Sequence, residues 1–205
     1  MRLILLGPPG SGKGTASRLL AEKLGVQKVV ASVLLRKESQ RDDEYADIIR
    51  ERMNTGNLVP DDIVNRVVLE RLKDLSGYVL DGYPRTKNQA EMLEKKLEEN
   101  DVSVDRVIYL DVELDVTLRR NMNRLTCSKC GFSPSPGADK CPVCGASLEK
   151  RSDDIVDTIT RRYKVYQDRT KPLIGYYKQR GVLLVIDANR TIQEVQESII
   201  KELGL

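Results

Sequence analysis

Apolar residues along the chain form short continuous runs that alternate with longer stretches of helical periodicity. Continuous apolar runs are typical of strands that are covered on both faces of a sheet. The predicted strands are residues 2–6, 28–30, 78–81, 106–112 and 182–187. The predicted helices are residues 13–24, about 34–55, 60–75, 86–100, 114–122, 153–171, 172–179 and 192–203. This alternation indicates an α/β protein with a parallel sheet flanked by helices.

Capping signals support several of the helix ends. Gly25 follows the first predicted helix, and Pro60-Asp61-Asp62 opens the third. Thr191 stands where the last helix needs an N-cap. These residues are typical of helix boundaries. A threonine side chain can pair with a free backbone N–H group, proline has no N–H group to pair, and glycine permits the turn that ends a helix.

Residues 125–150 break the alternation. They hold all 4 cysteines of the chain together with Pro134, Pro136 and Pro142, and they show no apolar periodicity. A chain of 205 residues can bury one substantial core. We therefore predict a single domain that carries this segment as a small insertion.

Composition narrows the classes of function. The 34 Lys and Arg nearly balance the 31 Asp and Glu, and the net charge of +3 does not favour nucleic acid or a membrane as partner. One Phe and no Trp leave little aromatic surface for stacking bases. The absence of His excludes imidazole catalysis, which phosphoryl transfer does not need. No run is long enough for a membrane span and no signal peptide is recognised, so we expect a cytoplasmic protein with few disulfides.

A glycine-rich loop, Gly7-Pro8-Pro9-Gly10-Ser11-Gly12-Lys13-Gly14-Thr15, follows the first apolar run. Such a loop turns its backbone N–H groups toward an anion at the positive end of a helix, and Lys13 adds a charge for terminal phosphates. The strict P-loop pattern has Ser or Thr directly after the lysine, whereas Gly14 stands there. A turn without a ligand is the alternative. The strand before, the helix after and the lysine offset favour a nucleoside triphosphate site.

Asp81-Gly82-Tyr83-Pro84-Arg85 follows the third predicted strand. A carboxylate at this end of a parallel strand, beside the loop, can order water around Mg²⁺. Arg85 can bind a phosphate with its guanidinium fork. The alternative is a turn with a surface arginine. Further arginines either form a solvated surface or belong to a hinged flap over phosphates; these are Arg36, Arg120, Arg124, Arg151 and Arg162.

The cysteines form two Cys-x-x-Cys-Gly knuckles, Cys127 with Cys130 and Cys141 with Cys144. Each knuckle presents two thiolates to one side, and the glycine permits the tight turn behind the second sulfur. Four thiolates make a closed tetrahedral site that suits a structural Zn²⁺. An iron–sulfur cluster, two disulfides and four free thiols are the alternatives.

Together these motifs resemble the adenylate kinases, in the long form whose lid carries zinc. The resemblance covers nearly all 205 residues. The further matching segments are Gly56-Asn57-Leu58-Val59-Pro60-Asp61, Thr86 with Gln89, Arg151-Ser152-Asp153-Asp154 and Pro172-Leu173-Ile174-Gly175-Tyr176-Tyr177. The family also places Gly and Thr after the loop lysine, which accounts for Gly14.

The resemblance implies a P-loop core of residues 1–29, 60–124 and 151–205, a helical monophosphate-binding insertion at 30–59 and a zinc lid at 125–150. It implies reversible phosphoryl transfer from Mg·ATP to AMP, giving two ADP, by a protein that is a monomer by family default. Another acceptor, GMP, CMP or UMP, is the nearest alternative. A zinc-ribbon ATPase or nucleic-acid-binding protein is more distant, because the charge balance and the missing aromatic residues argue against it.

Roles follow from the resemblance position by position. ATP would lie against Gly10, Ser11, Gly12, Lys13, Gly14, Thr15, Arg120, Arg124 and Arg190. The monophosphate would lie against Ala31, Arg36, Asn57, Leu58, Val59, Gly82, Arg85, Gln89, Arg151 and Arg162. Lys13, Arg85, Arg120, Arg124, Arg151 and Arg162 would be the catalytic cations. Asp81 would hold Mg²⁺ through water, and Asp153 and Asp154 would belong to the lid hinge.

The chain departs from the family pattern at both base sites. Ala31 replaces the threonine that contacts the adenine of AMP, Val33 replaces an acid, and Asn123-Arg124-Leu125 replaces Gly-Arg-Arg. The loop between the knuckles is short, and Phe132-Ser133 stands nearest the usual Tyr-His pair. Because an alanine methyl forms no hydrogen bond and a Gln89 amide can turn over to serve another base, we expect looser acceptor choice than is usual.

Overall fold

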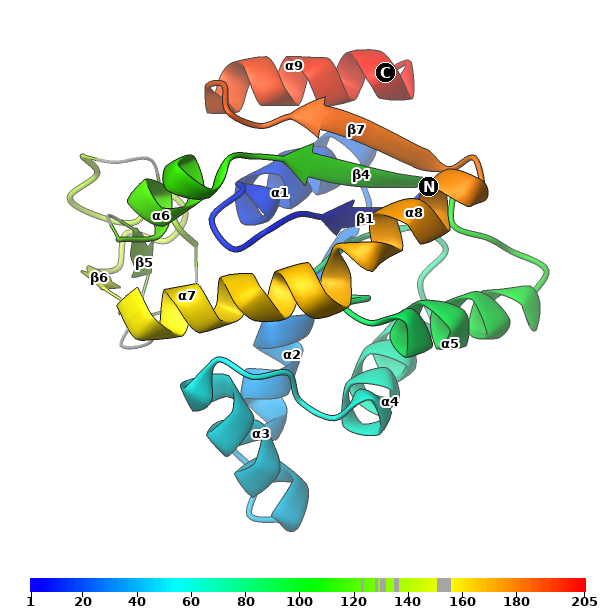
Figure 1. Cartoon of the computed structure of the whole chain (residues 1–205), viewed down its shortest axis with the longest axis horizontal. Helices are drawn as coiled ribbons and strands as arrows, with labels where there is room; N and C mark the ends of the chain where they lie inside the picture. Colours follow the sequence, from blue (N-terminus) through cyan, green and yellow to red (C-terminus); the bar gives the residue numbers. More distant parts are fainter. Residues whose placement is uncertain (123, 128, 130–131, 135–136, 151–155) are drawn as a thin grey trace.

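The computed structural model describes residues 1–122, 124–127, 129, 132–134, 137–150 and 156–205 (Figure 1). Its centre is a parallel sheet of five strands in the order β2-β3-β1-β4-β7. The strands are β1 (Arg2–Leu6), β2 (Gln27–Val30), β3 (Tyr78–Asp81), β4 (Arg106–Asp111) and β7 (Leu183–Asp187). The predicted α/β class is confirmed.

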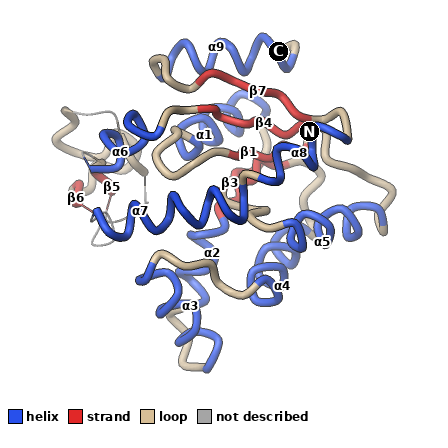
Figure 2. The backbone as a smooth tube through the Cα atoms, in the orientation of Figure 1, coloured by secondary structure: helices blue, strands red, loops and turns tan. Residues whose placement is uncertain are grey.

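Helices cover both faces of this sheet, as the tube view shows (Figure 2). One face carries α1 (Lys13–Leu24) and α9 (Ile192–Leu203). The apolar cluster on the other face includes residues of α4 (Asp61–Leu72), α5 (Lys87–Glu98), η1 (Tyr166–Thr170) and α8 (Pro172–Gln179), and it extends away from the sheet to α2 (Ala31–Glu38) and α3 (Glu44–Thr55). The remaining helices are α6 (Leu114–Met122) and α7 (Val156–Val165).

The continuous apolar runs are explained by this double cover. In β1, Leu3 and Leu5 pack toward α1 and α9, whereas Ile4 and Leu6 pack toward the opposite helices. Successive side chains of a strand point to opposite faces, so each residue of such a strand meets a helix. All four side chains are at most 3% exposed.

The predicted helix at 34–55 is wrong, because it is two helices with a break at residues 39–43. Ser39 ends α2, and the Asp43 side chain accepts a hydrogen bond from Ala46 N at 2.8 Å. An aspartate N-cap of this kind starts a new helix. The first of the two also begins earlier than expected, at Ala31, directly after β2.

The predicted helix at 153–171 also differs from the structure. Its first residues lie outside the described part of the chain, and from Tyr166 to Thr170 it is a π-helical turn, with Lys171 N donating to Tyr166 O at 2.9 Å. Pro172 follows, and its ring cannot fit against the carbonyl four residues back in a regular α-helix. A wider turn accommodates it, and it also aims Tyr166 and Thr170 inward.

The cysteine segment contains two short antiparallel strands that its sequence did not predict, β5 (Leu125–Cys127) and β6 (Leu148–Lys150). The other predicted helix and strand ends agree with the structure within three residues. Among the described residues, no helix combines the length and apolar character needed to cross a membrane.

Candidate active site

One cavity of about 1070 Å³ opens at the carboxyl ends of the central strands. It is larger than the usual 300–1,000 Å³ of a pocket for one drug-sized ligand. Every described residue predicted to bind nucleotide lines it. These are Gly10, Ser11, Gly12, Lys13, Gly14, Thr15, Ala31, Arg36, Asn57, Leu58, Val59, Asp81, Gly82, Arg85, Gln89, Arg120, Arg124, Arg162 and Arg190. Arg151, Asp153 and Asp154 lie outside the described residues.

The loop between β1 and α1 is shaped by its glycines and held from outside by Asn121. Gly10 has a φ of +83°, and a Cβ there would lie 2.4 Å from Asn121 Nδ2. That amide nitrogen donates to Pro9 O at 2.9 Å. The loop backbone and α6 therefore approach more closely than any other residue at position 10 would allow. The result is a fixed turn at the amino end of α1, where an anion is favoured.

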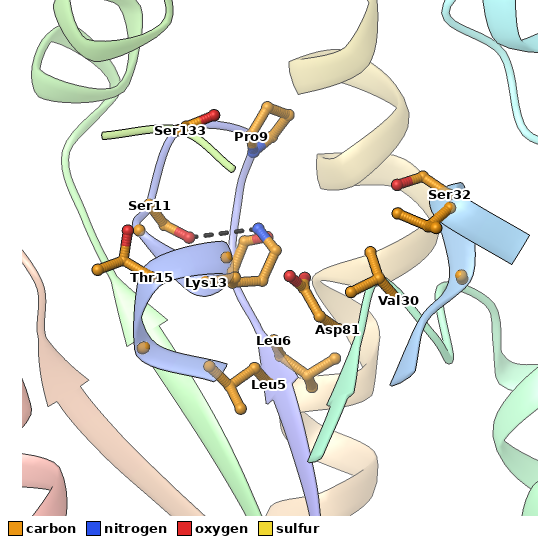
Figure 3. Close-up of a pocket in the computed structure, with 18 of the residues that line it drawn as sticks. Leu5, Leu6, Pro9, Ser11, Lys13, Thr15, Val30, Ser32, Asp81 and Ser133 are labelled. Atoms are coloured by element: carbon orange, nitrogen blue, oxygen red, sulfur yellow. Dashed lines mark hydrogen bonds between the residues drawn. The ribbon is translucent and has the colours of Figure 1, made fainter. Parts of the chain in front are cut away.

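Lys13 reaches back across this loop. Its Nζ donates to Gly7 O at 2.7 Å and to Pro8 O at 2.8 Å. It also donates to Ser11 Oγ at 3.3 Å (Figure 3). The pKa of Lys13 is lowered to about 8, chiefly by burial; Asp81 opposes this shift, and the neighbouring Arg85 and Arg124 contribute to it. A desolvated ammonium among arginines is a site that an anion would stabilise.

Asp81 is the buried carboxylate of this region. It stands opposite Leu5 at the end of β3, so its side chain lies beside the loop that follows β1. Figure 3 shows the Asp81 and Lys13 side chains pointing into the same pocket. Ser17 Oγ donates to Asp81 Oδ2 at 3.4 Å. An oxygen donor in this position suits Mg²⁺, which prefers carboxylate and water ligands.

Lys28 is a cavity residue that sequence reasoning missed. It comes from β2, and its Nζ donates to Gly14 O at 2.8 Å. Burial lowers its pKa as well, and Asp81 opposes the change. The available signal was a lysine in the strand predicted at residues 28–30, directly before Val29-Val30-Ala31. Three arginines that line the cavity were also not predicted, namely Arg18, Arg71 and Arg119.

Arg85 also lines the cavity, and two hydrogen bonds hold its own backbone. Its N–H donates to Gln89 Oε1 at 2.8 Å, and its carbonyl accepts from Thr170 Oγ1 at 2.9 Å. The guanidinium Nε donates to Gly82 O at 2.9 Å. The position of this arginine therefore depends on α5 and on the π-helical turn.

Gln89 is more constrained than the sequence suggested. It is 1% exposed, its Oε1 accepts from Arg85 N, and its Nε2 donates to Asp61 Oδ1 at 2.6 Å. Turning the amide over would place oxygen against a carboxylate and nitrogen against an N–H group. The expectation that this side chain flips freely to suit another base is therefore wrong.

Arg120 and Arg190 both lie at the loop that follows β7. Arg120 donates to Ala188 O at 2.9 Å and to Arg190 O at 3.1 Å. The Arg190 Nε donates to Asp187 Oδ2 at 2.9 Å. Burial lowers the pKa of Arg120 below its usual value. These bonds tie α6 to the carboxyl end of β7 and keep cationic groups on that wall of the cavity.

The 30–59 segment and α7 meet across the cavity. Arg161 donates to Thr55 O at 3.1 Å. Gly56 has a φ of +74°, and a Cβ on it would lie 3.1 Å from Thr158 Cγ2 and 3.4 Å from Arg162 Cγ. A glycine therefore permits the close approach that places Arg162 beside this segment.

Three cysteines come together in the segment that follows α6. The Sγ atoms of Cys127, Cys141 and Cys144 all lie within 4.8 Å of one another, and those of Cys127 and Cys144 are 3.4 Å apart. A tetrahedral zinc site with Zn–S bonds of about 2.3 Å separates its sulfurs by about 3.8 Å. The thiol donor set and its spacing therefore fit zinc. Cys130 lies outside the described residues.

The second knuckle has the turn that its sequence predicted. Gly145 has a φ of +73°, and its N–H donates to Cys141 O at 2.8 Å. The predicted role of this glycine is confirmed. Arg18 on α1 lies with its guanidinium carbon 4.8 Å from the centre of the Phe132 ring. This cation–π contact joins the cysteine segment to the helix behind the glycine-rich loop.

The fold and the cavity define a P-loop nucleotide-binding protein. Comparison with known sequences gives the family. A family model described as adenylate kinase matches residues 5–182. The adenylate kinase of Syntrophotalea carbinolica is 41% identical over 213 aligned positions, which cover 100% of this chain and 99% of the relative. The chain belongs to the adenylate kinase family.

Two further relatives extend this result. The adenylate kinase of Caldanaerobacter subterraneus subsp. tengcongensis is 40% identical over 212 positions, covering 99% of this chain and 96% of the relative. The adenylate kinase of Archaeoglobus fulgidus is 38% identical over 208 positions, covering 97% and 96%. Full-length similarity of this kind identifies the chain as a kinase of this family and does not favour a zinc-ribbon nucleic-acid-binding protein.

Proposed function

We propose that the protein transfers the γ-phosphoryl group of ATP to AMP, reversibly, giving two ADP. One observation carries this proposal: a single cavity of about 1070 Å³ joins the glycine-rich loop to Arg36, Arg85 and Gln89. The cavity is large enough for two nucleotides whose phosphates meet near its centre. Its walls hold an excess of cations over carboxylates, which suits a site where phosphates approach each other.

On the donor side, residues 10–15 bind the ATP phosphates through backbone N–H groups and the Lys13 ammonium. Arg120, Arg124 and Arg190 line the adjoining wall, where ATP would lie. Lys13 neutralises charge on the group in transfer. The lowered pKa of Lys13 supports this role, because a poorly solvated ammonium gains most from an approaching phosphate.

On the acceptor side, Arg36 and Arg85 bind the phosphate of AMP, and Asn57, Leu58, Val59 and Gly82 line its pocket with Ala31 and Gln89. Arg162, with Arg151, bridges the two nucleotides. In the forward step an oxygen of the AMP phosphate bonds to the γ-phosphorus, and the bond from that phosphorus to the β,γ-bridging oxygen breaks, so that ADP leaves. No general base is needed, because the attacking phosphate oxygen is already ionised.

The proposed function includes two metal ions, one bound with ATP and one bound by the cysteines. Mg²⁺ bound with ATP neutralises phosphate charge, and Asp81, held by Ser17, is the residue that would bind it through water. Zinc bound by Cys127, Cys130, Cys141 and Cys144 stabilises the segment at 125–150 and takes no part in the chemistry. A closed four-thiolate site leaves no coordination position for a substrate.

We further propose that residues 30–59 and 125–150 close over the cavity from either side of a core of residues 1–29, 60–124 and 151–205. Water must be excluded, since ATP would otherwise be hydrolysed. Arg36 in the first segment and Arg124 directly before the second both line the cavity and would move toward the phosphates on closure.

A coupled assay for ADP tests the function directly. With Mg·ATP and AMP the purified protein should form two ADP for each ATP consumed. With Mg·ATP alone it should form almost none, because the acceptor is missing. ADP formation at the same rate without AMP would contradict the proposal and indicate an ATPase. A panel of AMP, GMP, CMP and UMP at fixed ATP then ranks the acceptors.

A further inference from the structure

Asp61 lies at the start of α4, outside the phosphate-binding residues, yet it accepts from three side chains at the start of α5, one of which, Gln89, lines the cavity. Gln89 Nε2 donates to its Oδ1 at 2.6 Å. Thr86 Oγ1 donates to its Oδ2 at 2.8 Å, and Asn88 Nδ2 to the same oxygen at 3.2 Å. The carboxylate therefore joins the opening turns of α4 and α5.

The Gln89 amide is fixed in direction by these contacts. Its nitrogen faces the Asp61 carboxylate and its oxygen faces the Arg85 N–H at 2.8 Å. Thr86 Oγ1, which the Asp61 carboxylate holds, also caps α5 by accepting from Gln89 N at 3.1 Å. In a residue that is 1% exposed, a reversed amide would lose both side-chain bonds without water to replace them.

A fixed amide can read a base edge in one order only. A primary amide has two N–H donors and two acceptor positions on its oxygen, so one of each remains after the bonds to Asp61 and Arg85. A 6-amino purine presents a donor and then an acceptor along its Watson–Crick edge. A 6-keto purine presents the reverse order, so the two need opposite orientations of Gln89.

We propose that Asp61 is a specificity-determining residue, which holds Gln89 in the orientation that accepts a 6-amino purine monophosphate and rejects a 6-keto one. Asp61 does not contact the nucleotide in this proposal; it acts through Gln89. The inference rests on the proposed function, in which AMP is the acceptor. It also replaces the looser acceptor choice that Ala31 suggested, because base selection no longer depends on a bond from position 31.

The experiment compares AMP with inosine monophosphate, since these acceptors have nearly the same shape and differ at the two edge positions that Gln89 would read. In the Asp61→Asn variant, the new amide can accept from Gln89 or donate to it, so both orientations become possible. The ratio of kcat/KM for AMP to kcat/KM for inosine monophosphate should fall by about tenfold or more, mainly through KM. Thermal melting of each variant shows whether it is folded.

Asn88→Ala is the matched control. The exposed Asn88 side chain donates to Asp61 Oδ2, whereas the Gln89 amide donates to Oδ1, so loss of Asn88 leaves the bond that fixes the amide and the acceptor ratio should stay at its wild-type value. A merely structural role for Asp61 would lower the rates with both acceptors equally and leave the ratio unchanged, which would overturn the inference. If the wild-type protein does not phosphorylate AMP at all, the proposed function fails first.

A second measurement uses the unmodified protein, so it does not depend on the folding of a variant. The side-chain amide protons of Gln89 should give one pair of NMR resonances, with one proton shifted downfield by the carboxylate. Saturating AMP should leave a single pair. Two exchanging pairs would show that the amide turns over in the native protein, and this outcome would overturn the role of Asp61.

Discussion

Thr170 Oγ1 donates a hydrogen bond of 2.9 Å to the carbonyl oxygen of Arg85, 85 positions earlier in the chain. Thr170 is the last residue of the π-helical turn, and its side chain is buried. The wider turn brings this hydroxyl to the loop that carries the phosphate-binding arginine. A helix irregularity thus contributes to the geometry of the acceptor site.

Thr170→Val should therefore weaken the acceptor phosphate site. The substitution keeps the shape of the side chain but leaves the Arg85 carbonyl without this donor, so Arg85 loses one of its backbone supports. We expect the KM for AMP to rise by roughly three- to tenfold, the equivalent of one hydrogen bond, with the KM for ATP little changed. Steady-state kinetics with each substrate varied in turn measures this. The same substitution at exposed Thr160 should change neither KM.

Lys13→Met should abolish most of the turnover while preserving the fold. Lys13 neutralises charge on the group in transfer, and removal of one such group typically raises the barrier by about 3 kcal/mol, or more than a hundredfold in rate. Its contacts are to loop carbonyls and to a serine hydroxyl, and it packs no core. Turnover near the wild-type value in a correctly folded variant would show that the site is assigned wrongly.

ATP binding should take up protons above pH 8. The pKa of Lys13 is lowered to about 8 from 10.5 in the free protein, chiefly by burial. A bound triphosphate stabilises the ammonium and raises this pKa, so the complex holds more protons than the free protein between these values. Affinity should accordingly fall as the pH rises above 8.

Calorimetry at pH about 8.5 in buffers of different ionisation enthalpy measures the uptake. A non-hydrolysable ATP analogue prevents turnover during the titration, and its phosphates are already fully ionised at this pH. The uptake should shrink in Lys13→Met, which has no group to protonate. Proton release on binding, or equal uptake in both proteins, would contradict the assignment to Lys13.

Cys141→Ser should lower both the zinc content and the melting temperature. Its Sγ lies within 4.8 Å of the sulfurs of Cys127 and Cys144, so loss of one thiolate opens the metal site. Because metal binding stabilises a segment that is too short for its own core, the loss should appear in stability first. Phosphoryl transfer should persist in the fraction that stays folded at low temperature.

Elemental analysis of the freshly purified protein is the direct check on this site. We expect about one zinc per chain for a four-thiolate site. Iron with visible absorbance, or no metal, would exclude a zinc site. Lys140→Gln is the control, because Lys140 is exposed and directly precedes Cys141 without supplying a thiolate.

A mimic that joins two adenosines through a chain of phosphates should compact the protein. Residues 125–150 should become protected from hydrogen exchange, since closure would bring this segment down over the cavity that Phe132, Ser133 and Val143 already line. AMP alone should protect residues 30–59 and leave 125–150 as they are. An unchanged scattering radius and unchanged exchange at saturation would argue against closure.

Much of this protein could be predicted from its sequence because the determining signals are local. Because helices cover both faces of β1, all of Leu3–Leu6 must be apolar, and this continuous apolar run predicts a strand of a parallel sheet. The phosphate-binding loop could be predicted from Gly10, Gly12 and Lys13. Glycines that permit a left-handed backbone, with a lysine at a fixed offset from them, are found in few other kinds of turn. The knuckle glycine Gly145 is readable for the same reason.

Tertiary structure decided what depends on residues that are distant in sequence. The π-helical turn follows from fitting Pro172 while Tyr166 and Thr170 pack inward, and periodicity does not distinguish it from an α-helix. The cavity position of Lys28 depends on where β2 lies beside Gly14. Gln89 appeared in the sequence as an adaptable amide; only the packing of α4 against α5 brought Asp61 to its nitrogen and fixed its direction. The sequence determines which chemical groups are present, whereas the packing of helices and strands determines which of them become hydrogen-bond partners.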